Sequence, residues 1–209
     1  LEPRITQYDT VAGDGDCGTT LLSGCELIKK ALGDSKSPLS THLEDPAATV
    51  YEVANLLEDS MGGTSGGIYL IFMSALAASL TSIKGTKLTV HDLAESMKEA
   101  ETALFKYTKA RVGDKTLVDA LLPFIDSLLK TGDLQTATNT AIKHAKETKK
   151  LDAKFGRASY VSKDAFKEFH SSSGTSTPKE PSESQSDEDL EEDDGLGGIP
   201  DPGAIGLAS

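Results

Sequence analysis

The sequence has no tryptophan, few aromatic residues and only two cysteines among its 209 residues. Cys17 and Cys25 are eight residues apart, which along a helix is about 12 Å and too far for a disulfide. Without a histidine cluster beside them, this cysteine content argues against a zinc site and favours a reducing compartment. We therefore expect a cytoplasmic protein with its scattered histidines at the surface: His42, His91, His144 and His170.

The sequence also lacks a secretory signal and any apolar run of about 18 residues, the length that suggests a membrane span. The most apolar segment, 68–80, is short and is expected to be a buried helix. No basic stripe indicates a nucleic-acid partner. The net charge of −12 is uneven, because residues 171–198 hold nine acidic residues and one lysine, which leaves −4 for the rest. We expect neither nucleic acid nor membrane as a partner.

No segment shows the alternation of a β-strand, whereas apolar residues at helical spacing recur along the chain. Helices are predicted over 19–32, 47–61, 65–82, 90–110, 116–130 and 133–150, with a short one beginning at Pro202. The fold class is therefore all-α. Thr19 or Thr20 is expected to cap the first of these helices, Thr89 and Asp92 resemble a capping box, and Asp201 is expected to cap the last.

Two of these helices have predicted buried stripes. In 19–32 the stripe is Leu21, Leu22, Cys25, Ile28 and Leu32, and in 90–110 it is Leu93, Met97, Ala100, Leu104 and Tyr107. Side chains at these spacings share one helix face, so we expect both stripes to pack on the core.

Composition divides the chain into three parts. Residues 1–170 form a helical domain, 171–198 are rich in Ser, Pro, Glu and Asp and are predicted to be a disordered insert, and 199–209 return to the domain. The chain begins with Leu, so we expect it to be a piece of a longer protein.

Three carboxylates lie close together in the stretch DTVAGDGDCGTT: Asp9, Asp14 and Asp16. Glycines between them allow a turn that folds the two later acids inward. Converging carboxylates need a compensating charge, and oxygen ligands suit Mg2+ or Ca2+. The stretch is predicted to be a divalent-metal loop that opens onto a helix N-terminus, where phosphate binds readily.

Other interpretations of this stretch are weaker. Gly13, Gly15 and Gly18 match a dinucleotide-binding pattern, but two Asp residues within it would repel a pyrophosphate and no βαβ unit surrounds it. An EF-hand loop fails, because its twelfth position is Cys25 or Thr20 rather than Glu. A plain polar turn before a helix stays open on local evidence alone.

A second glycine-rich turn, MGGTSGG at 61–67, carries the hydroxyls of Thr64 and Ser65. Such a turn can leave backbone N–H groups open to an anion, or it can serve close helix packing. Two hydroxyl-bearing glycine turns in one small domain favour a nucleotide-phosphate site. In a third loop, GDKTLVD, Asp114 and Asp119 are expected to be a cap and a surface charge.

GDGDCGTT, MGGTSGG, GDKTLVDAL, GRASY and DPGA occur in this order. With them the chain resembles the C-terminal ATP-binding domain of dihydroxyacetone kinases, in particular the single-chain eukaryotic type that includes triokinase/FMN cyclases. The resemblance implies an antiparallel eight-helix barrel, here cut short at both ends, with ATP bound at one end.

It also implies a set of site residues. Asp9, Asp14 and Asp16 would hold two Mg2+ ions that bridge the ATP phosphates. The remaining implied contacts are Cys17, Gly18, Thr19, Thr20, Thr64 and Ser65 with phosphate; Gly113, Thr116 and Leu117 along the nucleotide; Asp201, Pro202 and Gly203 closing over it; and Arg157 adding positive charge.

The resemblance implies that the triose is held by a histidine on a separate domain, so we expect no catalytic residue in this chain. That domain is the expected partner, within a homodimer of the full protein, and the chain alone is expected to be inactive. The competing hypothesis is a non-catalytic helical scaffold that binds nucleotide or lipid. The sequence leaves an FMN cyclase activity undecided.

Overall fold

The computed structural model describes residues 1–83, 87–160 and 198–209, and within these ranges it contains helices and no strand. The all-α prediction is confirmed. The helices are α1 (Glu2–Ala12), α2 (Cys17–Gly33), α3 (Pro38–Thr41), α4 (Pro46–Ser60), α5 (Gly63–Ser82), α6 (Val90–Leu104), α7 (Val118–Thr131), α8 (Leu134–Glu147), η1 (Thr148–Lys150), η2 (Arg157–Tyr160) and α10 (Pro202–Ala208).

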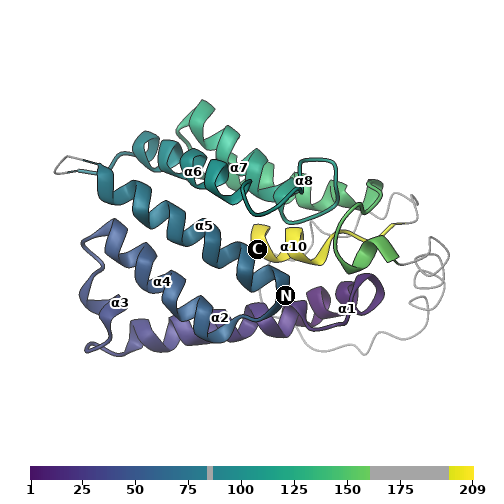
Figure 1. Ribbon diagram of the computed structural model, residues 1–209, viewed down its shortest axis with the longest axis horizontal. Coiled ribbons are helices and arrows are strands. Elements are labelled where there is room, and N and C mark those ends of the chain that lie inside the picture. Colours follow the sequence, from purple (N-terminus) through teal and green to yellow (C-terminus); the bar gives the residue numbers. More distant parts are fainter. Residues whose placement is uncertain (84–86, 161–197) are drawn as a thin grey trace, which may run out of the picture.

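The long helices pack side by side in the order α1, α2, α4, α5, α6, α7, α8, and α10 contacts both α1 at one side of this series and α7 and α8 at the other. Figure 1 shows α10 lying between these two sides, next to the N-terminus. Because α4 and α5 are joined by residues 61–62, and α7 and α8 by 132–133, each pair forms an antiparallel hairpin. Loops therefore gather at the two ends of the bundle.

Helix α1 lies where the sequence analysis assigned no helix. Its mean hydropathy is low and its apolar residues are few, so helical spacing is weak there, but Ile5 and Ala12 are buried against the rest of the fold. A side chain at Gly18 would overlap Thr6 and the backbone of Glu2. Thus α1 is held by close packing on a glycine of α2 rather than by a long apolar stripe.

The predicted buried stripe of α2 is wrong. Leu22 and Leu32 are 42% and 48% exposed, and Cys25 is also exposed. The buried positions are small: Cys17, Gly18 and Gly24. The physical reason is close helix approach, since a Cβ at Gly24 would come within 2.9 Å of the Met61 sulfur. The predicted caps also fail, because α2 begins at Cys17 with Asp16 at the N-cap position.

The main core lies between α5, α6 and α7. Leu104, Val118 and Ile125 are fully buried in it, with Phe72 and Leu76 from α5. The Thr89–Asp92 capping box is confirmed at the start of α6. That helix ends at Leu104 instead of continuing to 110, so the predicted stripe holds for Leu93 through Leu104 but Tyr107 is 73% exposed.

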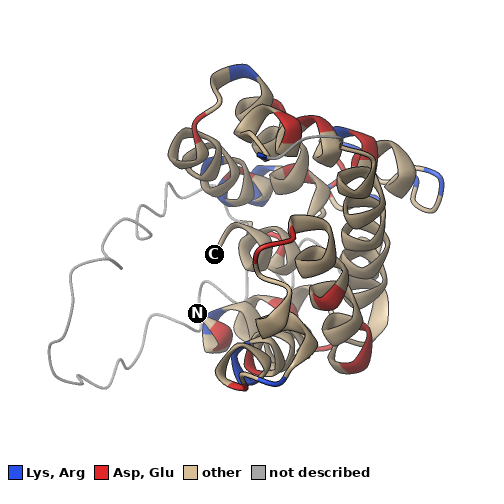
Figure 2. Ribbon diagram, turned by 90° about the vertical axis from the view of Figure 1, so that its left-hand side faces the viewer, with Lys and Arg blue, Asp and Glu red and all other residues tan. Residues whose placement is uncertain are grey.

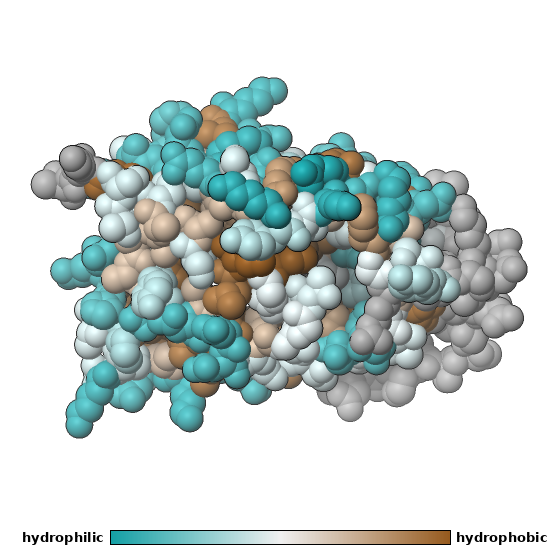
Figure 3. All heavy atoms as spheres, in the orientation of Figure 1, coloured by the Kyte–Doolittle hydropathy of each residue, from teal (hydrophilic) through white to brown (hydrophobic). Residues whose placement is uncertain are grey.

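Helix α5 is long and apolar enough to cross a membrane by length and composition, and it is the one such helix in the described ranges. A core helix of a soluble protein passes the same test. In this fold α5 packs along α4 and α6. Apolar side chains gather in the middle of the face where α5 passes the end of α10 (Figure 3). The absence of a membrane partner stays a prediction.

The C-terminal segment returns to the bundle at Ile199, which is 1% exposed. Asp201 caps α10 as predicted, its side chain accepting a hydrogen bond from the Ala204 N–H. The predicted insert at 171–198 lies outside the described residues except for Gly198, as does His170. His42 and His91 are exposed as expected, and His144 is half-buried.

Candidate functional site

A pocket of about 320 Å³ opens at the end of the bundle where α1 meets α2 and α4 meets α5. The loop before α7, residues 155–158 and the start of α10 complete its wall. Five chain segments that are distant in sequence therefore converge there. The lining includes most of the residues predicted for the site: Asp9, Asp14, Asp16, Cys17, Thr20, Thr64, Ser65, Thr116, Leu117, Asp201, Pro202 and Gly203.

The three predicted metal ligands meet in this pocket. Asp9, Asp14 and Asp16 each present a carboxylate oxygen within 4.8 Å of the others. Asp9 comes from the last turn of α1 and is buried, and its Oδ2 accepts a hydrogen bond from the Cys17 N–H at 3.0 Å. Three carboxylate oxygens at this spacing fit a hard divalent cation such as Mg2+.

Two glycines make this convergence sterically feasible. Gly15 has φ +81°, a left-handed conformation that L side chains rarely adopt, and it turns the chain between Asp14 and Asp16. A side chain at Gly13 would overlap the Asp9 carboxylate. The acidic loop therefore needs glycine at both positions, which is what its sequence provides.

The four residues predicted to contact phosphate at the start of α2 divide into two groups. Cys17 and Thr20 line the pocket. Gly18 packs on α1, and the Thr19 hydroxyl donates a hydrogen bond to the Asp16 carbonyl. Burial, with Asp9 nearby, raises the pKa of the Cys17 thiol to about 12, so it stays protonated at neutral pH and is a poor nucleophile.

The residues of the second glycine turn divide between the pocket wall and helix packing, and the phosphate contacts of Thr64 and Ser65 stay a prediction. Gly62 and Gly63 line the pocket with Thr64 and Ser65, at the N-terminus of the 20-residue helix α5. Backbone N–H groups there have no partner within the helix and favour an anion. Gly66 instead serves packing, because a Cβ there would overlap the Met61 carbonyl.

The loop before α7 is fixed by two aspartates, and the expectation of a surface charge at Asp119 is wrong. Asp119 is 2% exposed, and its carboxylate accepts hydrogen bonds from Gly113 N–H at 2.6 Å and Thr116 N–H at 2.8 Å. Asp114 accepts from Arg111 N–H and from the Lys154 ammonium at 2.6 Å, which holds its pKa below the usual range. Gly113 therefore shapes the loop without lining the pocket.

Lys115 is the charged lining residue that the sequence analysis missed. It lines the pocket, is 5% exposed, and has φ +59°, the one positive φ at a non-glycine among the described residues. Such a conformation costs about 1–3 kcal/mol. The motif GDKT contains this lysine, but nothing in its spacing shows that the turn faces inward. Thr108, Ala110 and Phe155 are further lining residues without a sequence signal.

Asp201, the N-cap residue of α10, lies in the wall of the pocket. Its N–H donates to the Thr148 hydroxyl at 2.8 Å, and Thr148 is fully buried. Burial raises the pKa of Asp201 to about 7, although its hydrogen bond to Ala204 and the charge of Lys115 act in the opposite direction. Arg157 begins η2, between the lining residues Gly156 and Ala158.

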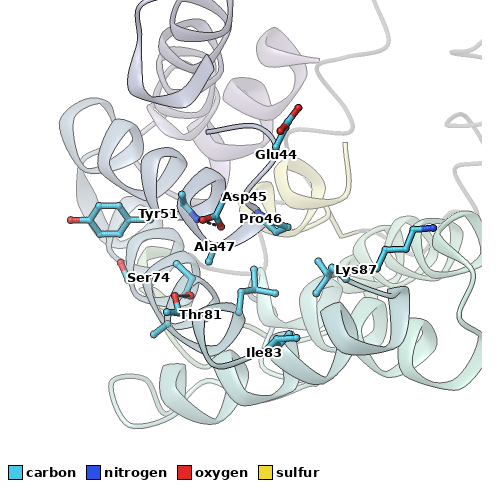
Figure 4. A pocket seen from close by; sticks show the side chains of 14 residues that line it. Glu44, Asp45, Pro46, Ala47, Tyr51, Ser74, Thr81, Ile83 and Lys87 are labelled. Atoms are coloured by element: carbon cyan, nitrogen blue, oxygen red, sulfur yellow. Dashed lines mark hydrogen bonds between the residues drawn. The ribbon is translucent and has the colours of Figure 1, made fainter. Parts of the chain in front are cut away.

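A larger cavity of about 990 Å³ lies at the other end of the α4–α5 hairpin (Figure 4). Its lining is largely aliphatic, with Leu80, Ile83 and Leu88 among it. The Asp45 carboxylate in its wall accepts from Ala48 N–H as the cap of α4. Figure 4 shows Glu44 and Lys87 extending away from the other labelled side chains. No group of acids able to hold a metal is found there among the described residues.

Seen from that far end, acidic and basic residues intermix over the helices (Figure 2). The described residues on this face show no continuous basic stripe of the kind that binds a nucleic-acid backbone. The two ends of the bundle therefore differ in that only one of them, among the described residues, carries the acidic pocket.

Comparison with protein families identifies the class of protein: residues 11–177 match the DAK2 domain, and the chain belongs to that family. Among curated relatives, it is 45% identical to dihydroxyacetone kinase of Komagataella pastoris and 42% identical to dihydroxyacetone kinase 2 of Saccharomyces cerevisiae, over 100% of this chain in both cases. It is 34% identical to triokinase/FMN cyclase of Homo sapiens over 78% of this chain.

The fold agrees with that family. The crystal structure of the dihydroxyacetone kinase of C. freundii superposes on all of this chain with a TM-score of 0.68 at 25% identity. The structure of the C. freundii enzyme in complex with AMP-PNP and Mg2+ gives a TM-score of 0.65. The chain spans 28–31% of the length of these relatives and covers 29–30% of the solved chains, so it corresponds to one domain of a larger protein in each.

Proposed function

We propose that this chain is the ATP-binding domain of a dihydroxyacetone or glyceraldehyde kinase, and that it positions Mg-ATP for transfer of the γ-phosphoryl group to a triose held on a separate domain. The observation that carries the proposal is the convergence of Asp9, Asp14 and Asp16 beside two helix N-termini. Family membership and a solved relative in complex with AMP-PNP and Mg2+ support it.

Each part of the pocket has a role in this proposal. The three carboxylates would hold Mg2+, which when bound neutralises charge on the phosphates. The N-termini of α2 and α5, with Thr20, Thr64 and Ser65, would bind phosphate oxygens. Leu117 and Pro202 would border the nucleotide. Phosphoryl transfer depends mainly on positioning and charge, so the pocket needs no nucleophile.

Further parts of the proposal concern the whole protein. We expect the triose-binding domain to be the partner of this chain, within a homodimer located in the cytoplasm. We also expect the helices to close into an eight-helix barrel. The competing hypothesis of a non-catalytic scaffold lacks a reason for three clustered acids, because carboxylates brought together without a cation destabilise a fold.

The test is calorimetric titration of the full-length protein with ATP, first with Mg2+ and then with EDTA. We expect binding that requires Mg2+, and phosphorylation of dihydroxyacetone under the same conditions. No binding in either condition, from a protein shown to be helical, would favour the scaffold hypothesis.

A further inference from the structure

The acidic pocket poses an electrostatic problem for its proposed ligand. Asp9, Asp14, Asp16 and Asp201 all line it, and a nucleoside triphosphate brings several more negative charges. Mg2+ held by Asp9, Asp14 and Asp16 would balance part of this negative charge. Lys115 is the one positively charged residue among the described side chains that line the pocket. It comes from a different loop than the three carboxylates of the metal cluster.

We propose that Lys115 is a phosphate-binding residue of this site, its ammonium group contacting a β- or γ-phosphate oxygen of the nucleotide. This inference rests on the proposed function and adds to it a residue that neither the sequence motifs nor the comparisons assign. Three observations support it: where the residue lies, how it is held, and what surrounds it.

The position of Lys115 is unusual for a lysine. At 5% exposed it is almost fully buried, whereas lysine side chains are mostly exposed. Lys109, earlier in the same loop, is exposed. An ammonium group buried in the wall of a pocket is partly desolvated, and a bound polyphosphate would add to the anions that stabilise its charge.

The backbone at Lys115 is held in place from both sides. Asp114, just before it, is tied to Arg111 and Lys154, and Asp119 accepts hydrogen bonds from Gly113 and Thr116 around it. Between these contacts, Lys115 has a positive φ although it carries a Cβ. Backbone strain that neighbouring contacts enforce is concentrated at functional sites, where it fixes a side chain for its ligand.

The third observation concerns the charges around the Lys115 ammonium group. Burial lowers the pKa of its ammonium group, and the charges of Asp201 and Asp152 act against that lowering. A purely structural lysine that pairs with these two carboxylates is the competing explanation. The two explanations differ in one respect: only a phosphate-binding lysine responds to the number of phosphates on the nucleotide.

The experiment compares Lys115→Met, Lys115→Arg and the control Lys109→Met in the full-length protein. Affinities for Mg-ATP, Mg-ADP and AMP are measured by calorimetry, with melting temperature as a check on folding. We expect Lys115→Met to weaken Mg-ATP binding by about 10- to 100-fold, the range for loss of a hydrogen bond to a charged group, and AMP binding by much less. Lys115→Arg should recover part of the loss, and Lys109→Met should bind as the parent protein does.

A second measurement needs no variant and so does not depend on folding of the mutants. Modification of lysines by acetic anhydride is followed by mass spectrometry with and without saturating Mg-ATP. We expect Mg-ATP to slow modification of Lys115 and to leave Lys109 unchanged.

Equal losses for ATP and AMP, or labelling of Lys115 that Mg-ATP does not slow, would overturn the inference in favour of a structural lysine. Failure of the parent protein to bind Mg-ATP would instead overturn the proposed function itself, so the two failures are distinguishable.

Discussion

The pockets at the two ends of the α4–α5 hairpin differ in volume and in the charged residues that line them. The far end has the larger volume, about 990 Å³ against 320 Å³, but its wall is mostly aliphatic and its Asp45 is already used as a helix cap. The near end is smaller and brings four aspartates and a lysine together from distant segments. Convergence of charged groups, rather than volume, distinguishes the end that we expect to bind a ligand.

The reason for the difference lies in the turns. At the near end Gly62 and Gly63 have no Cβ, so the first turn of α5 is open to the pocket. At the far end, α4 begins with its own cap: the Asp45 side chain accepts a hydrogen bond from the Ala48 N–H, and Pro46 has no N–H to satisfy. A helix N-terminus that caps itself leaves little for an anion to bind.

The sharpest test of this comparison removes a carboxylate from the near end. Asp14→Ala or Asp16→Ala should weaken Mg2+-dependent ATP binding by at least about 100-fold, because loss of a direct metal ligand exceeds the 10- to 100-fold cost of losing an outer partner. Helicity by circular dichroism should be mostly unchanged. Asp59→Ala, which removes an exposed carboxylate outside the pocket, is the matched control. Unchanged binding in the Asp14 and Asp16 variants would remove the metal assignment.

A second test uses the raised pKa of Asp201. Because its pKa in the folded protein is about 7, above the ordinary 3.8, its stabilising contribution is complete below about pH 4 and is lost as pH rises toward 7. Without metal or nucleotide, the parent protein should therefore lose about 2–4 kcal/mol of unfolding free energy relative to Asp201→Asn between pH 4 and 8. Urea denaturation at a series of pH values measures this. Parallel pH profiles would show that Asp201 titrates normally.

A third test concerns the loop that carries Lys115. Asp119→Ala should lower the unfolding free energy by about 2–3 kcal/mol, because it leaves the Gly113 and Thr116 N–H groups without their charged acceptor. Asp119→Asn keeps one acceptor oxygen and should cost less. Chemical denaturation measures both variants. Equal stability of Asp119→Ala and the parent would mean that the loop does not depend on this carboxylate.

The smallest effect is expected at the far end. Ser74→Leu, in the wall of the larger cavity, should leave Mg-ATP affinity within about 2-fold of the parent, because distant sites act independently. Ser74 lies nine residues along α5 from Ser65, which is about 14 Å of helix rise and beyond the range of direct contact. Calorimetric titration decides the outcome, and a large loss of affinity would break the proposed distinction between the two ends.

Local sequence patterns predicted the elements well where helical spacing and capping agreed. The capping box at Thr89 and the cap at Asp201 are both present in the structure. Helices α4, α5 and α7 begin and end within two residues of their predicted limits. The pattern failed where packing depends on small residues. The apolar stripe of α2 is largely exposed because the close contacts of that helix are made at Gly18 and Gly24.

The sequence by itself determined the all-α class, the acidic glycine loop and the family to which its motifs belong, because these depend on residue types at short spacing. Only the tertiary structure decided that Asp119 is buried, that Lys115 faces the pocket, and that α10 brings Asp201 to the same wall. Each of these depends on contacts between segments far apart in the chain, and short-range spacing carries no information about which segments meet.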